Sequence, residues 1–123
     1  MVAGSYASGT STFPLLGVSI GEMLNNISAK YPDNEAIVSV HQNIRWTYRQ
    51  FLENVNQVAR GLMGLGVEKG DRVGIWAMNH AEWVVVQFAT AKIGAIMVNI
   101  NPAYRTYELE YALKQSEIQT LII

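Results

Sequence analysis

The sequence contains no cysteine, so disulfide bonds, thiolate metal sites and cysteine nucleophiles are excluded. Charge is also scarce: only 15% of the residues are charged, and nine basic residues face ten acidic ones, for a net charge of -1. The basic residues are scattered singly, without the cluster that a nucleic-acid-binding surface needs. We therefore expect no nucleic-acid partner. The lack of cysteine also fits a reducing compartment, and we expect a cytoplasmic protein.

Long apolar runs and metal-ligand clusters are missing as well. The longest mostly apolar run, residues 83–100, is interrupted by Gln, Lys, Gly and Asn, so we predict no membrane-spanning helix. Residues 1–18 lack the basic start and apolar centre of a signal peptide and are rich in Gly, Ser and Thr, which predicts an extended surface arm. His41 and His80 have no second ligand at metal-binding spacing in the sequence, so we predict no metal site.

Apolar residues, by contrast, are plentiful enough for one folded domain. Half of the 123 residues are hydrophobic, which is typical of a globular chain rather than a disordered one. A chain of this length buries roughly two thirds of the surface that it exposes when unfolded. We predict that residues 19–123 form a single folded unit.

The first predicted helix follows this arm. Ser19 and Glu22 have the spacing of a capping box, and Pro32 prevents the helix from continuing. The apolar face predicted for this helix consists of Ile20, Met23, Leu24, Ile27 and Tyr31.

A hairpin and a second helix come next. Ala36–Val40 and Ile44–Thr47 are short β-favouring runs, separated by three polar residues that predict a turn. Thr47 and Gln50 form another capping box, which begins the most clearly amphipathic helix of the chain, and Gly66 ends it. The apolar stripe predicted for this helix consists of Phe51, Val55, Val58, Leu62 and Leu65.

The centre of the chain has the pattern of a βαβ unit. Arg72–Ala77 and Ile96–Ile100 read as buried strands, and Ala81–Ile93 between them has the length of a helix. Without a tight turn between them, the two strands are predicted to be parallel. Asn79 and Glu82 are predicted to cap the helix. Because this helix is apolar nearly all round, we expect it to be buried on more than one side.

A fourth helix and a third strand complete the predicted fold. Thr106 is predicted to cap a helix that contains Leu109 and Leu113, and Thr120–Ile123 reads as a third parallel strand. The fold class is therefore α/β, a βαβαβ parallel sheet with flanking helices and an N-terminal hairpin. Because a domain seldom ends on an uncovered apolar strand, we expect a longer parent chain. We also expect the isolated chain to associate with itself through this edge.

Three polar residues follow the carboxyl ends of predicted parallel strands. Ligands of open α/β sheets bind at that edge, so Asn79, His80 and Asn101 are the candidates for a site. The structural interpretation is that Asn79 caps a helix, His80 is exposed in its first turn and Asn101 makes a turn before Pro102. We favour the structural interpretation, because a lone histidine without a partner is weak support for acid–base chemistry. We assign no catalytic, cofactor-binding or metal-binding residue.

Three further patterns also have ordinary explanations. Gly61–Gly66 is rich in glycine, but it ends a helix before a strand, the reverse of a dinucleotide-binding loop. Tyr6–Pro14 has hydroxyls and glycine but contains no lysine or arginine, follows no strand and opens no helix, so it is interpreted as part of the arm. Six aromatic residues are candidates for a pocket lining, and most are predicted to lie in the core. They are Trp46, Trp76, Trp83, Tyr104, Tyr107 and Tyr111.

Several segments together resemble a known family. They are Arg45–Phe51, Val58–Leu62, Leu65–Val67, Lys69–Val73, Ala91–Ala95 and Asn99–Pro102. In this order they are similar to the N-terminal segment of AMP-forming acyl-CoA synthetases, of the adenylate-forming superfamily. Pro14–Gly17 and Tyr104–Leu113 resemble its branch that activates medium- and long-chain fatty acids. The resemblance extends over essentially the whole chain.

The resemblance implies a two-step ligase reaction in a longer parent protein. A fatty acid attacks the α-phosphate of Mg-ATP to give an acyl-adenylate and pyrophosphate, and the thiol of coenzyme A then displaces AMP. Residues 19–123 would be the N-terminal part of the large AMP-binding domain. The family's phosphate loop, its ribose-binding acidic residue, its hinge arginine and its C-terminal lysine have no counterpart here. The resemblance therefore implies that this chain alone is inactive and binds ATP, Mg²⁺ and coenzyme A weakly or not at all.

Two other functions stay open at this point. A stand-alone binding or interaction module could have the same fold without catalysis, and a reading frame that ends near Ile123 would favour it. A small flavodoxin-like nucleotide-binding protein is disfavoured, because no phosphate loop follows any predicted strand.

Overall fold

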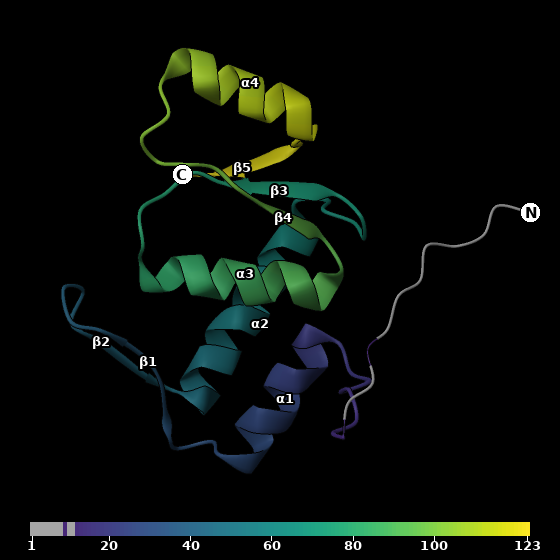
Figure 1. The fold of residues 1–123 in the computed structure, drawn as a ribbon. Helices are drawn as coiled ribbons and strands as arrows, with labels where there is room; N and C mark the ends of the chain where they lie inside the picture. The colour runs from purple at the N-terminus through teal and green to yellow at the C-terminus, as the bar shows by residue number, and fades with distance from the viewer. Residues whose placement is uncertain (1–8, 10–11) are drawn as a thin grey trace, which may run out of the picture.

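The computed structural model describes residue 9 and residues 12–123. In these residues the chain forms four helices and five strands (Figure 1). In chain order they are α1 (Ile20–Lys30), β1 (Glu35–Ser39), β2 (Ile44–Thr47), α2 (Tyr48–Gly64), β3 (Arg72–Ile75), α3 (Ala81–Ile93), β4 (Ile96–Asn99), α4 (Thr106–Ser116) and β5 (Thr120–Ile122). No helix in this part of the chain is both long and apolar enough to cross a membrane.

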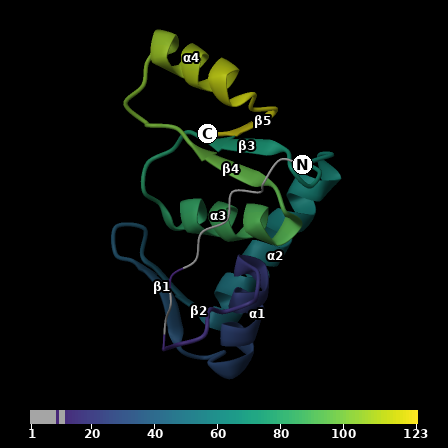
Figure 2. The same ribbon diagram turned by 45° about the vertical axis from the view of Figure 1, so that its right-hand side comes forward.

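The strands form two separate sheets. β1 and β2 pair antiparallel as a hairpin, while β3 lies between β4 and β5 in a three-stranded parallel sheet. Helix α3 covers one face of the parallel sheet and α4 lies on the opposite face, as Figures 1 and 2 show from two directions. The predicted α/β fold, with its βαβαβ parallel sheet and N-terminal hairpin, is confirmed.

Helix α3 is the most enclosed element of the described residues. It contacts β4 on its sheet side and α1, α2 and β1 on its other side, and of its residues only Glu82 and Gln87 are exposed. The predicted burial on more than one side is therefore confirmed. Lys92 near its end donates to the side-chain oxygens of Asn25 on α1 and Asn56 on α2, each at 2.7 Å. Burial lowers the pKa of Lys92, and its ammonium group ties three helices together.

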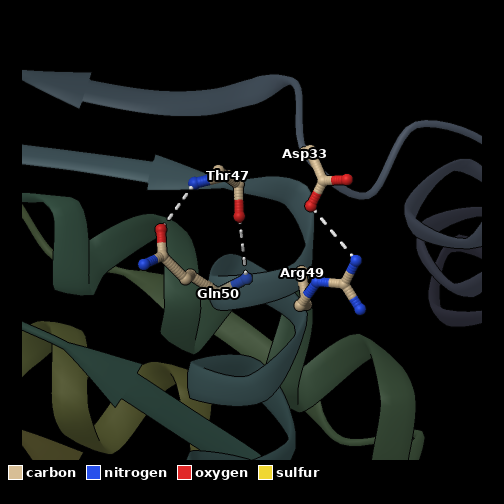
Figure 3. Close-up of polar contacts among 4 residues, drawn as sticks. All are labelled: Asp33, Thr47, Arg49 and Gln50. Atoms are coloured by element: carbon tan, nitrogen blue, oxygen red, sulfur yellow. Dashed lines mark hydrogen bonds and ion pairs between the residues drawn. The ribbon is translucent and has the colours of Figure 1, made fainter.

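Helix α2 begins as its capping box predicts. The Gln50 amide nitrogen lies 3.3 Å from the Thr47 hydroxyl oxygen, and the Gln50 side chain accepts from the Thr47 backbone amide at 2.9 Å (Figure 3). In the same view Arg49 pairs with Asp33 at 3.1 Å, an exposed ion pair that contributes little stability. The chain leaves the helix through Gly66 in the left-handed conformation, at φ +89°, as predicted.

Two of the predicted apolar faces are only partly buried. In α2 the buried residues are Phe51, Val55, Ala59 and Leu62, whereas Leu65 is 77% exposed because the helix ends just before it. In α1 the buried residues are Gly21, Leu24 and Ser28, and the predicted face members Ile20, Met23 and Tyr31 are exposed. A spacing pattern identifies a helix face, but the neighbouring elements decide how much of that face is covered.

Of two other predicted helix caps, one is half present and the other is wrong. The Ser19 hydroxyl accepts from the Glu22 amide at 3.2 Å, but no return bond from Ser19 to the Glu22 side chain exists in the described structure. Thr106 was the wrong residue for the α4 cap, because it is already helical. Arg105 occupies the cap position, and its backbone amide donates to the Glu108 carboxylate at 3.2 Å. The arginine side chain has no acceptor to offer the helix, so this cap is one-sided.

The predicted arm can be followed only in part. Most of residues 1–11 lie outside the described residues, and residues 12–18 form neither helix nor strand. The boundary between the arm and the folded unit at residue 18 stays a prediction.

Helices α1 and α3 touch at a glycine. A β-carbon added to Gly21 would lie 2.8 Å from the Lys92 γ-carbon and 3.1 Å from its α-carbon. The second of these atoms belongs to the backbone of α3, so it cannot move aside without shifting the whole helix. The close approach of the two helices therefore requires a glycine at this position.

We predict that Gly21→Ala destabilises the protein by about 1–3 kcal/mol, because the added methyl group pushes α1 away from α3. Gly61→Ala is the matched control, because Gly61 is also helical but has nothing within 4 Å of an added β-carbon. This control should stabilise the protein by roughly 0.5–1 kcal/mol through helix propensity. Urea unfolding measures both changes, and effects of the same sign would contradict the packing argument.

Candidate functional site

The carboxyl ends of β3, β4 and β5 lie at one edge of the parallel sheet, because the three strands run in the same direction. Helix α3 begins at this edge and the turn of the hairpin lies on the same side (Figure 1). The chain passes from β3 to β4 on one side and later to β5 on the other, so the strand order reverses beside β3. Such a switch point is where open α/β sheets bind ligands.

The structure confirms the turn predicted at Asn101. The Asn101 side-chain oxygen accepts from the Ala103 amide at 3.0 Å, and its carbonyl oxygen accepts from the indole N–H of Trp76 at 3.1 Å. No hydrogen bond among the described residues joins Asn101 to Asn79 or His80. The three candidates therefore share an edge without forming one polar cluster.

The cap predicted for α3 is wrong. Asn79 is exposed and lies outside the helix, and His80 occupies the cap position without a side-chain hydrogen bond to the helix. The cap comes instead from the hairpin turn: the Gln42 side-chain oxygen accepts from the Ala81 amide at 2.8 Å. The Gln42 side-chain nitrogen donates to the Glu82 carboxylate, also at 2.8 Å. A single side chain from a distant segment thus provides the hydrogen-bond acceptor for the first backbone amide of α3.

The hairpin turn carries further polar contacts around Gln42. The Ser39 hydroxyl donates to the Gln42 oxygen at 2.8 Å, and the Ser39 oxygen lies 3.3 Å from His41 Nδ1. Because the single hydroxyl proton is directed to Gln42, His41 Nδ1 is the donor in the second contact. The rings of His41 and His80 meet edge to face, with centroids 5.4 Å apart. No spacing in the sequence indicates this cluster, because some of its members precede α2 along the chain and the others follow it.

Glu82 responds to this environment. The hydrogen bond from Gln42 and then a backbone hydrogen bond lower the pKa of its carboxyl group. Burial opposes them, and the nearby His80 and His41 contribute a smaller lowering of the pKa. Glu82 is therefore ionised throughout the neutral range. Its negative charge lies at the N-terminus of α3, where it interacts favourably with the helix dipole.

These residues do not fit a nucleotide phosphate or a metal ion. The first amide of α3 already donates to Gln42, and the Glu82 carboxylate would repel an anion there. Within the described residues, no group of three His, Asp or Glu side chains is placed to hold a metal ion. Gly66 ends a helix, as predicted, and most of Tyr6–Pro14 lies outside the described residues.

The same edge contains an apolar pocket of about 450 Å³ between β3, β5 and the start of α3. Its apolar lining comprises Ile75, Ala77, Met78, Trp83, Val86, Ile122 and Ile123. Of the six aromatic candidates, Trp83 lines this pocket, and Trp46 and Trp76 are half-buried elsewhere. Tyr104, Tyr107 and Tyr111 are exposed, so the prediction that most of the six lie in the core is wrong.

Comparison with known proteins identifies similar chains. The profile of the family described as AMP-binding enzyme matches residues 24–123. The Bacillus subtilis protein YngI is 50% identical over 109 residues, which are 89% of this chain and 20% of that protein. The mitochondrial medium-chain acyl-CoA ligase ACSF2 of Mus musculus is 43% identical over 111 residues, 90% of this chain and 18% of the ligase.

A solved structure is similar to the fold as a whole. The structure of a Mycobacterium tuberculosis fatty acyl CoA synthetase superposes with a TM-score of 0.81 at 32% sequence identity. The superposition covers 84% of this chain and 20% of the synthetase. The chain thus spans about a fifth of the length of the proteins that it matches.

We predict that Gln42→Ala destabilises the protein by roughly 0.5–2 kcal/mol, because the first amide of α3 loses its acceptor. Gln87→Ala is the matched control, since this exposed residue of α3 makes no side-chain hydrogen bond in the described structure. Urea unfolding compares the two variants. An equal effect of both would show that the cap from the hairpin contributes nothing.

We also predict that part of the stability depends on pH through Glu82. Because its pKa is lowered in the folded chain, this contribution is complete above the ordinary pKa of a glutamate and is lost as the pH falls through the lowered value. Glu82→Gln removes the contribution, so the wild type should exceed the variant in unfolding free energy at neutral pH, and the difference should shrink in acid. Glu53→Gln, whose carboxylate makes no hydrogen bond or ion pair in the described structure, gives the reference profile. A difference independent of pH would contradict the assignment.

Proposed function

The chain belongs to the AMP-binding enzyme family, and from this membership we propose that the protein containing it is an acyl-CoA synthetase. The proposed reaction activates a carboxylic acid with Mg-ATP to an acyl-adenylate and pyrophosphate, and then transfers the acyl group to coenzyme A with release of AMP. The proposed substrates are fatty acids. The observation that carries the proposal is the family match over residues 24–123, supported by relatives named as a medium-chain acyl-CoA ligase and a fatty acyl CoA synthetase.

The proposed role of these 123 residues is structural. They supply strands of a parallel sheet and the helices on its two faces, and the described residues contain no group of three His, Asp or Glu placed to hold a metal ion. We therefore assign no catalytic or cofactor-binding residue to this chain. ATP, Mg²⁺ and coenzyme A are proposed ligands of the longer protein, and the isolated 123-residue chain is proposed to be inactive.

Compartment and association are further proposals. The cytoplasm is the proposed location, on the grounds of a cysteine-free sequence, although the name of one relative places that protein in mitochondria. Self-association of the isolated chain stays a prediction. It is supported by the position of β5 at the edge of its sheet and by the 85% exposure of Ile123.

The test of the proposed function begins with the complete reading frame that encodes this chain. The purified product is incubated with Mg-ATP, coenzyme A and carboxylic acids of short, medium and long chain, and AMP, pyrophosphate and acyl-CoA are measured. We expect all three products together, and we expect acyl-adenylate without acyl-CoA when coenzyme A is omitted.

The 123-residue chain alone is the control and should release no AMP. A complete protein that releases no AMP with any acid would contradict the proposed function. A reading frame that ends near Ile123 would do the same, and the stand-alone binding module would then take its place.

A further inference from the structure

A second apolar pocket lies beside α3, on the side away from the parallel sheet. Figures 1 and 2 show α1, α2 and the hairpin on that side, and the pocket, of about 300 Å³, lies between α1, β1, α2 and α3. Among the described residues its lining comes only from the segment 23–88. The volume is at the lower end of the range for small-molecule sites, so a ligand of this pocket must be small.

The lining of this pocket selects against charge. None of the described residues that line it is charged, and Tyr48 is the only one with a polar side-chain group. A charged ligand would lose its hydration there without gaining an ionic partner. An uncharged apolar molecule, by contrast, gains free energy when its surface is buried. The pocket therefore fits ligands that carry no charge.

Aromatic rings form part of the wall. Phe51 is 3% exposed and Phe88 is half-buried, and their rings meet edge to face with centroids 5.4 Å apart. Packed rings of this kind hold one another in place and offer further aromatic contacts to a ligand ring. Of the described residues that line the pocket, only Met23 is exposed, and its flexible thioether chain can adjust to the shape of a ligand.

We propose that this pocket binds a small uncharged aromatic molecule of one or two fused rings. Water is a poor occupant of an apolar pocket, because it needs several polar partners, and an apolar cavity of about 150 Å³ is already large enough for benzene. A ligand here would contact Ala36 and Ile37 of the hairpin together with Val84 of α3. It would thus stabilise the folded state by binding only to the packed arrangement of these elements. The site is separate from the proposed reaction, and the inference does not depend on it.

Indole is the probe that tests the proposal in the complete protein, and titration calorimetry measures its dissociation constant. Ala36→Leu fills part of the pocket and should weaken indole binding by about tenfold or more. Ala29→Leu is the matched control, because Ala29 is exposed on α1 and does not line the pocket, and it should bind indole as the wild type does. Tryptamine, which adds an ammonium group to the same ring system, should bind the wild type about tenfold more weakly than indole.

A crystal of the wild-type protein soaked with 5-bromoindole gives a second measurement that needs no variant, and it decides if Ala36→Leu fails to fold. The anomalous signal of the bromine should place the ring beside Phe51 and Phe88. The inference is overturned if indole does not bind, if the bromine lies elsewhere, or if a protein segment fills the pocket in that crystal. It is also overturned if folded Ala36→Leu binds indole as tightly as the wild type, or if tryptamine binds as tightly as indole. None of these results affects the release of AMP, so the proposed function is tested separately.

Discussion

The structure depends on the burial of α3. A helix that is apolar nearly all round cannot lie at a surface, so it must be covered on several sides at once. The parallel sheet covers one side of α3, and α1, α2 and the hairpin cover the other. This requirement joins the two sheets, which share no strand, into one folded unit. Two residues serve the same requirement. Lys92 bonds to both neighbouring helices, and Gly21 lets α1 approach closely enough to cover α3.

The backbone groups at the ends of a helix lack hydrogen-bond partners within the helix. In an enclosed helix, water has less access to these groups, so other parts of the chain must provide the partners. At the start of α3 the solution is not local. The Gln42 side chain reaches across from the hairpin turn and satisfies the Ala81 amide, while it also binds Glu82. The hairpin thus does more than cover apolar surface. It fixes the position of the loop that forms one wall of the pocket at the carboxyl edge of the sheet.

The features that the sequence predicted correctly are those that depend on neighbours along the chain. The capping box of Thr47 and Gln50, the left-handed Gly66 and the end of α3 at Ile93 are local, and the structure agrees with them. The errors concern contacts between distant segments. Asn79 had the right spacing for a cap, but Gln42 provides it. The burial of Leu65 and Tyr107 depended on neighbours that the pattern does not specify. The resemblance supplied the family, whereas the hairpin cluster and the pocket required the tertiary structure.

The strand order also determines when the sheet can form during synthesis. β3 is the central strand, yet both strands that pair with it are made after it. The helices and hairpin that precede β3 must wait for α3, which they cover, and one edge of β3 remains unpaired until residues 120–122 emerge. Pairing between such distant segments is slow, because a long loop must close first. A pause in translation after β4 would therefore expose an open strand edge at the centre of the future sheet, the kind of surface that chaperones bind.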